Sequence, residues 1–148
     1  MREFVLTDTN IQLRSADPAH VMHNDAVSAI EQIRRNGDIP CIVPQIIIEF
    51  RAVCTRPQNV NGLGMDQLRV QNEIMLLKKV FPLFNDTPER FAEWERIVEM
   101  YGSEGKHNHD ARLVAAMSIH GISTILTFNK SDFLRYKGFT VVEPKDLL

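Results

Sequence analysis

The stretch Phe4-Val5-Leu6-Thr7-Asp8-Thr9-Asn10 is the best starting point for predicting the architecture of this chain. Its first three residues form a short apolar run, which is typical of a buried strand, and Asp8-Thr9-Asn10 indicates a polar turn directly after it. The pattern therefore places the carboxylate of Asp8 at the C-terminal end of a strand.

Strand and helix patterns alternate along the rest of the chain. Apolar residues recur at helical spacing from Ala19 to Arg35, and Asn36-Gly37 is typical of a helix C-cap. The later segments predict, in order, a strand over 39–43, a helix opened by Pro44, a loop over 56–64, a helix over 66–80, a helix capped by Thr87-Pro88 that runs to Tyr101, a helix with Asp110 in its first turn that stops at Gly121, a strand over 123–128, a turn or short helix over 129–136, and a strand over 139–142. Alternating strands and helices predict an α/β fold with a parallel sheet covered on both faces. Because no linker, repeat or low-complexity tract interrupts the pattern, we expect one domain over residues 1–148.

The composition is that of an ordinary soluble domain. Hydrophobic residues make up 44% of the 148 positions and charged residues 24%, which argues against disorder and against a fibrous architecture. No apolar run approaches the roughly 20 residues of a membrane-spanning helix, and the N-terminus lacks a signal-peptide pattern, so we expect a cytoplasmic protein. Cys41 and Cys54 lie in apolar surroundings without a CxxC pattern, which favours reduced thiols that act as small hydrophobic side chains.

The formal net charge is −2, whereas nucleic-acid-binding proteins usually carry a basic excess. If four of the 19 acidic residues surround metal ions, however, 15 remain against 17 Lys and Arg residues, and the rest of the surface is mildly basic. The charge alone therefore decides neither for nor against a nucleic-acid substrate.

Four carboxylates are candidates for one shared site. Asp8 and Asp132 follow predicted strands, and Glu49 and Asp110 lie early in predicted helices. All four can therefore reach the crevice beyond the carboxyl ends of the strands. Converging ionised carboxylates repel one another, and hard divalent cations such as Mg²⁺ or Mn²⁺ are their usual partners. Such a cation activates water and stabilises charge on phosphate oxygens, which favours phosphodiester hydrolysis as the reaction.

Polar residues beside the carboxylates are candidates for orienting them or for holding water around the ion: Thr9, Asn10, Thr127 and Asn129. Each carboxylate also has a purely structural interpretation. Asp8 and Asp110 suit helix caps or helix-dipole partners. Glu49 suits a solvated helix face, and Asp132 suits a turn. Spacing alone leaves both interpretations open.

Four segments resemble, in chain order, the four acidic motifs of PIN domains. They are Val5-Leu6-Thr7-Asp8-Thr9-Asn10, Val43-Pro44-Gln45 through Ile48-Glu49-Phe50, Asn108-His109-Asp110-Ala111-Arg112-Leu113-Val114-Ala115-Ala116, and Ile125-Leu126-Thr127-Phe128-Asn129-Lys130-Ser131-Asp132-Phe133. The resemblance spans nearly the whole chain. The segment from Thr55-Arg56-Pro57 to Asn61-Gly62-Leu63-Gly64 further resembles one branch of the VapC-like toxins of bacterial toxin-antitoxin pairs.

This resemblance implies a three-layer α/β/α fold of the PIN kind, Mg²⁺- or Mn²⁺-dependent endoribonuclease activity, a homodimer, and inhibition by a cognate antitoxin protein. It assigns catalytic roles to Asp8, Glu49, Asp110 and Asp132, of which we expect Asp8, Asp110 and Asp132 to hold the metal. Some relatives carry an acid directly after the Thr-x pair, where this chain has Asn129, so the fourth acidic role falls to Asp132. Basic residues that flank the acids in sequence are candidates for holding RNA phosphates: Arg14, Arg51, Arg112 and Lys130.

Three other interpretations compete with this one. His107-Asn108-His109-Asp110 offers ligands that suit zinc, but the spacing differs from HxHxDH, and we expect His107 and His109 to be solvated turn residues. Asp8-Thr9-Asn10 is similar to the nucleophile loop of haloacid-dehalogenase-type phosphatases, but Asn10 stands where that family has its second Asp. The third alternative is a PIN-like fold kept as a partner-binding module without catalysis, and binding of Mg²⁺ or Mn²⁺ by the folded chain distinguishes it.

Overall fold

The computed structural model describes residues 2–148, which form a four-stranded parallel sheet with helices on both faces. The strand order is β2-β1-β3-β4. β1 at Phe4–Thr7 pairs with β2 at Ile39–Cys41 and with β3 at Thr124–Leu126, and β3 pairs with β4 at Thr140–Val142. The predicted α/β fold with a parallel sheet is confirmed.

Seven α-helices and two short 3₁₀ segments connect or follow these strands within residues 2–148. They are α1 Thr9–Ser15, α2 His23–Arg35, α3 Pro44–Thr55, the 3₁₀ segment η1 Gln58–Val60, α4 Gln67–Val80, α5 Arg90–Tyr101, α6 His107–His120, the 3₁₀ segment η2 Lys130–Asp132, and α7 Pro144–Leu147.

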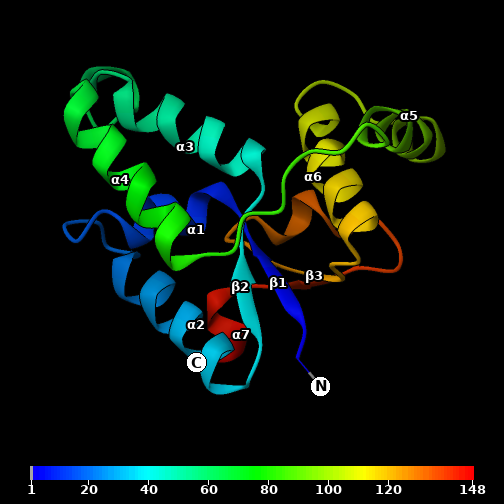
Figure 1. The fold of residues 1–148 in the computed structure, drawn as a ribbon, viewed down its shortest axis with the longest axis horizontal. Coiled ribbons are helices and arrows are strands. Elements are labelled where there is room, and N and C mark those ends of the chain that lie inside the picture. Colours follow the sequence, from blue (N-terminus) through cyan, green and yellow to red (C-terminus); the bar gives the residue numbers. More distant parts are fainter. Residues whose placement is uncertain (1) are drawn as a thin grey trace.

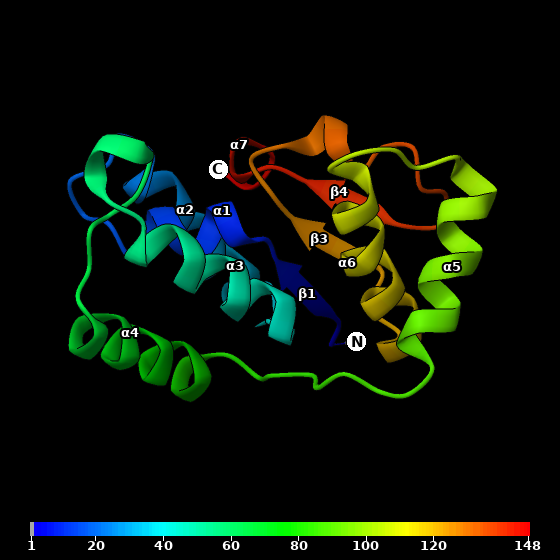
Figure 2. The same ribbon diagram turned by 90° about the horizontal axis from the view of Figure 1, so that it is seen from above.

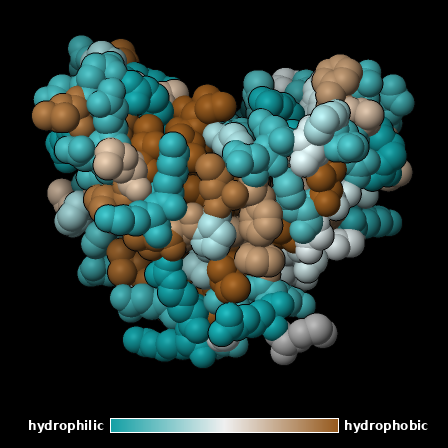
Figure 3. All heavy atoms as spheres, viewed as in Figure 1, coloured by the Kyte–Doolittle hydropathy of each residue, from teal (hydrophilic) through white to brown (hydrophobic). Residues whose placement is uncertain are grey.

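The helices form two layers around the sheet. Figures 1 and 2 show α2 and α7 on one side of the sheet and α5 with α6 on the other. Above the carboxyl ends of the strands, α3 and α4 stand apart from α5 and α6, and Figure 3 shows the surface hollowed between these two lobes. Apolar side chains join one core, in which Leu6, Ile42, Phe50 and Leu126 are fully buried. No helix of the described residues is long and apolar enough to cross a membrane.

Local sequence signals explain several helix boundaries. Pro44 lies in the first turn of α3, where its missing N–H needs no partner. The Asp66 side chain caps α4 by accepting the N–H of Arg69 at 2.8 Å. Gly121 ends α6 with a φ of 69°, a left-handed conformation that glycine adopts at little cost. These boundaries agree with the predictions.

The chain departs from prediction on both sides of α1. The residues after β1 were predicted to be a turn, but Asp8 caps the short helix α1 by accepting the N–H of Thr9 at 2.8 Å. The next helix, α2, begins at His23 and not at Ala19. The preceding residues form turns instead, in which the N–H of Met22 donates to a ring nitrogen of His20 at 3.0 Å.

The start of α5 also differs from prediction. The helix begins at Arg90 with no side-chain cap, so the prediction that Thr87 caps it is wrong. Thr87 instead accepts the N–H of Arg90 at 3.2 Å through its backbone carbonyl. Arg90 is 6% exposed, and its side chain donates to Gln45 on α3 at 2.7 Å, a contact that the local pattern does not reveal. The strands β2, β3 and β4 are each shorter than predicted, and α7 was not predicted.

Candidate functional site

Four carboxylates line one cavity of about 400 Å³ at the carboxyl ends of the strands. Asp8 is the N-cap of α1, Glu49 lies in α3, Asp110 lies in the first turns of α6, and Asp132 ends the 3₁₀ segment after β3. The topology explains this convergence, because β1 and β3 are neighbours and the segments that follow them lie side by side. The structure therefore brings the four predicted carboxylates to one cavity.

Asp8 is the most buried of these carboxylates, at 8% exposed. One of its oxygens accepts the N–H of Thr9 at 2.8 Å, and the other accepts the hydroxyl of Thr127 at 2.8 Å. Burial raises the pKa of Asp8 to about 6, the two hydrogen bonds oppose this increase, and the charges of Glu49 and Asp110 add to it. Because the ionised form is unfavourable here, a nearby cation would stabilise it strongly.

Asp110, Asp132 and His107 form the tightest group of potential metal ligands. One ligand atom from each lies within 4.8 Å of the others, and His107 Nδ1 is 3.0 Å from Asp110 Oδ2. Lys106 Nζ lies 3.4 Å from Asp132 Oδ1. Burial raises the pKa of Asp110, the charge of Asp132 raises it further, and the hydrogen bond from His107 lowers it. Carboxylate oxygen and imidazole nitrogen together suit a divalent cation.

Glu49 is held by polar side chains on two helices. Thr9 Oγ1 donates to Glu49 Oε1 at 2.7 Å, and Gln45 Nε2 lies 3.4 Å from Glu49 Oε2. Gln45, which is 3% exposed, also donates to the carbonyl of His109 at 2.9 Å and accepts from Arg90 at 2.7 Å. Because a guanidinium only donates, Arg90 fixes the amide of Gln45 with its NH₂ group toward Glu49. A chain of buried polar groups thus connects α5 to the cavity.

The predicted supporting residues lie around Asp8. Asn10 Nδ2 is 3.4 Å from Asp8 Oδ2 and 3.3 Å from Thr127 Oγ1, and Asn10 Oδ1 accepts the N–H of Phe128 at 3.1 Å. The N–H of Asn129 donates to Thr127 Oγ1 at 3.0 Å, and Asn129 also lines the cavity. These bonds tie the end of β1 to the end of β3 and fix the orientation of the Asp8 carboxylate.

The structure regroups the predicted metal ligands. Asp110 and Asp132 belong to the tightest group, and His107 is its third member. Asp8 lines the same cavity but does not belong to this group. The prediction that His107 is a solvated turn residue is wrong, because it begins α6 and its side chain is only 27% exposed. Its spacing of three residues from Asp110 is a signal that could have found it, since residues i and i+3 share a helix face.

The basic residues that line the cavity are Arg56 and Lys106. The four predicted phosphate-binding residues lie elsewhere in the described chain: Arg14 in the last turn of α1, Arg51 bonded to Gln67, Arg112 in a separate cleft, and Lys130 at 3.5 Å from Asp146. None of the four lines the acid cavity, and their role in holding phosphates stays a prediction. Arg112 follows Asp110 by two positions, which is a rotation of about 200° around a helix.

Solved structures of bacterial toxins share this fold. VapBC2 from Rickettsia felis, bound to a promoter DNA fragment, gives a TM-score of 0.70 at 12% identity over 95% of this chain and 98% of that one. A toxin-antitoxin complex from Klebsiella pneumoniae gives 0.62 at 21% identity over 95% and 97% of the two chains. VapC20 from Mycobacterium tuberculosis, a sarcin-ricin loop cleaving toxin, gives 0.56 at 14% identity over 82% and 86%. Neither a protein-family model nor a curated protein matches the chain.

The chain therefore has the PIN-domain fold of the VapC toxins. The three-layer architecture and the resemblance carried by the four acidic motifs are confirmed at the level of the fold.

Proposed function

We propose that the chain is a metal-dependent endoribonuclease that hydrolyses phosphodiester bonds of RNA. The observation that carries this proposal is the convergence of Asp8, Glu49, Asp110 and Asp132 on one cavity at the carboxyl edge of a parallel sheet. The fold shared with VapC20, a sarcin-ricin loop cleaving toxin, supports RNA as the class of substrate. Residues 1–148 then act as a single nuclease domain.

The donor set of the cavity fits Mg²⁺ or Mn²⁺. Oxygen ligands predominate, and hard divalent cations prefer them. Burial raises the pKa values of Asp8 and Asp110, so a cation beside them relieves an unfavourable free energy. We propose Asp8, Asp110 and Asp132 as the ligands, with His107 as a further one. A bound cation of this kind lowers the pKa of a coordinated water and stabilises charge on phosphate oxygens.

The chain's own residues supply the remaining functions. Lys106 and Arg56 line the cavity and carry the positive charge that attracts the phosphates of an RNA strand. Glu49, whose two oxygens are oriented by Thr9 and Gln45, is the carboxylate that we assign to proton acceptance. In this assignment, Asp8, Asp110 and Asp132 hold the cation and Glu49 accepts the proton.

Cleavage of a labelled single-stranded RNA, followed on denaturing gels, tests the proposal. We expect cleavage in Mn²⁺, its loss in EDTA, and a reduction of about 10-fold or more in Asp8→Asn. Asp25→Asn, which removes an exposed acid in the first turn of α2, is the matched control and should cleave like the wild type. Full activity in EDTA would contradict the proposal.

A catalytically silent PIN-like module is the alternative function. Mg²⁺ or Mn²⁺ that binds only the folded chain must raise its melting temperature by mass action. We therefore expect a concentration-dependent increase for the wild type and little increase for Asp110→Asn. A wild-type melting temperature that changes with neither cation would favour the silent module.

We further propose that the chain is the toxin of a toxin-antitoxin pair and forms a homodimer. Two structures of the same fold are a VapBC2 assembly and a toxin-antitoxin complex, which supports a small protein partner. The exposed apolar side chains along α4 offer a surface for a partner to bury: Leu68, Met75, Leu76 and Val80. Expression of the chain alone should stop growth, and pull-down from the host should recover an inhibitory protein. Unaffected growth with no such protein would remove the toxin proposal and leave the nuclease proposal standing.

A further inference from the structure

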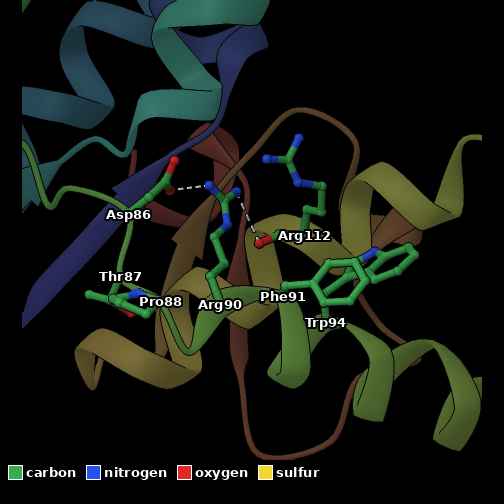
Figure 4. Close-up of a pocket in the computed structure, with 7 residues that line it drawn as sticks. All are labelled: Asp86, Thr87, Pro88, Arg90, Phe91, Trp94 and Arg112. Carbon is green, nitrogen blue, oxygen red and sulfur yellow. Dashed lines mark hydrogen bonds and ion pairs between the residues drawn. The ribbon is translucent and has the colours of Figure 1, made fainter.

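We propose that a second cleft, between α5 and α6, binds one nucleotide of the RNA strand, with the base against Phe91 and Trp94 and the phosphate at Arg112. This inference rests on the proposed function and adds a binding subsite to it. The cleft has a volume of about 410 Å³. Figure 4 shows the guanidinium groups of Arg90 and Arg112 and the carboxylate of Asp86 lying together, with the rings of Phe91 and Trp94 beside each other.

The aromatic part of the cleft suits a planar ligand. Phe91 is 65% exposed, and its ring centroid lies 5.7 Å from that of Trp94 with an interplanar angle of 33°. The indole N–H of Trp94 donates to the carbonyl of Asn108 at 2.8 Å, which holds this ring in place. Exposed aromatic faces bind successive bases of single strands by stacking, largely without regard to sequence.

The charged part of the cleft suits an anion. Arg112 is exposed, and no ion pair involves it among the described residues. Arg90 is 6% exposed and pairs with Asp86, and its Nε is buried without a hydrogen-bond partner inside the described chain. The cleft is therefore lined by two guanidinium groups and one carboxylate. A base with its phosphate is planar and anionic, and it matches both halves of the cleft.

The cleft and the acid cavity are linked by shared structural elements. Arg112 and Asp110 both belong to α6 and lie on opposite sides of its first turns, about 200° apart. Gln45 connects the two sites from within, because it accepts from Arg90 at 2.7 Å and its Nε2 lies 3.4 Å from Glu49. An RNA strand that passes over the N-terminal turns of α6 would place one nucleotide in the cleft and a neighbouring phosphate in the cavity.

Fluorescence of Trp94 tests this inference directly, because it is the one tryptophan in the sequence. The experiment titrates a short single-stranded oligoribonucleotide into the Asp8→Asn chain in EDTA, because the variant and the chelator together suppress the proposed cleavage. We expect saturable quenching, weakened about 10-fold or more by adding Phe91→Ala. Adding Arg112→Ala should weaken binding and flatten its salt dependence. Arg35→Ala, an exposed cation on α2, is the matched control and should change neither quantity.

The outcomes separate this inference from the proposed nuclease. An absence of quenching, or quenching unchanged by Phe91→Ala and Arg112→Ala, overturns the nucleotide site even if the wild type cleaves RNA. Quenching that depends on both residues while the wild type cleaves no RNA upholds the site and removes the nuclease. If oligonucleotides leave Trp94 unaffected but Phe91→Ala changes the sedimentation mass, the cleft is a protein contact and the inference is wrong.

Discussion

Replacing Asp8 with Asn probes the electrostatics of the acid cavity. Asp8 is 8% exposed, and burial raises the pKa of its carboxyl group from the ordinary value of 3.8 to about 6. A carboxyl group with a raised pKa binds its proton more tightly in the folded than in the unfolded chain. Its stabilising contribution is therefore complete below about 3.8 and is lost as the pH rises through about 6.

The size of the effect follows from the same values. At about 1.4 kcal/mol per pH unit, the displacement from 3.8 to about 6 corresponds to about 3 kcal/mol. Asn has the same shape without the charge, but its NH₂ group cannot accept the hydroxyl of Thr127 and comes close to the NH₂ group of Asn10. Loss of that hydrogen bond offsets about 1 kcal/mol, so a net gain of about 2 kcal/mol remains at neutral pH.

Urea unfolding in EDTA measures this difference for the wild type and Asp8→Asn at about pH 4 and about pH 8. We expect the variant to be the more stable chain at the higher pH and to lose that advantage at the lower pH. Adding Mn²⁺ at the higher pH should stabilise the wild type and leave the variant nearly unchanged. Asp25→Asn, at an exposed acid, controls for the loss of one negative charge. A stability difference between wild type and Asp8→Asn that is the same at both pH values would refute the reasoning.

Three further predictions follow from other parts of the structure. Asp132→Asn should weaken Mn²⁺ binding in calorimetry about 10-fold or more, whereas Asn129→Ala should retain near wild-type affinity, because Asn129 offers no charge; equal losses would contradict this. Arg90→Met should lower the free energy of unfolding by roughly 1–3 kcal/mol in urea titrations, because it leaves the buried Gln45 Oε1 on α3 without its donor and removes the bond to the Arg112 carbonyl on α6. An unchanged midpoint would show that these bonds add nothing. Burial raises the pKa of Cys41 to about 12 and that of Cys54 to about 11, so neither thiol of the native chain should react with iodoacetamide at about pH 8. Rapid labelling of the two cysteines in mass spectrometry would contradict this prediction.

Much of the fold could be predicted because its signals are local. Pro44 and Asp66 mark helix starts through the chemistry of their own side chains and of the few residues that follow. The helix α1 was missed for a physical reason. Asp8-Thr9-Asn10 suits a turn and a helix cap equally well, and seven residues are too few to display a helical period. Burial of Ile11 and Leu13 distinguishes the two, and that burial exists only in the folded chain.

The candidate site was predictable to the extent that topology determines it. The carboxylates could be located because residues after parallel strands share one edge of the sheet. The partners of those carboxylates could not. Arg90 and Gln45 are 45 positions apart, and no periodicity or capping pattern reports a hydrogen bond between them. The contact between Lys106 and Asp132 was not predictable for the same reason, because it depends on the packing of α6 against the segment after β3.

The two interpretations of Asp8 that the sequence left open are compatible, and their combination is informative. One oxygen caps α1 and the other accepts from Thr127, so the residue performs a structural task. Ser, Thr or Asn at this position would satisfy the helix as well, and would bring no buried charge to repel Glu49 and Asp110. Capping therefore explains why the side chain is short and polar, but it does not explain why it is ionisable. The cation that we propose for this cavity would account for an acid whose burial is unfavourable and which lies where other acids converge.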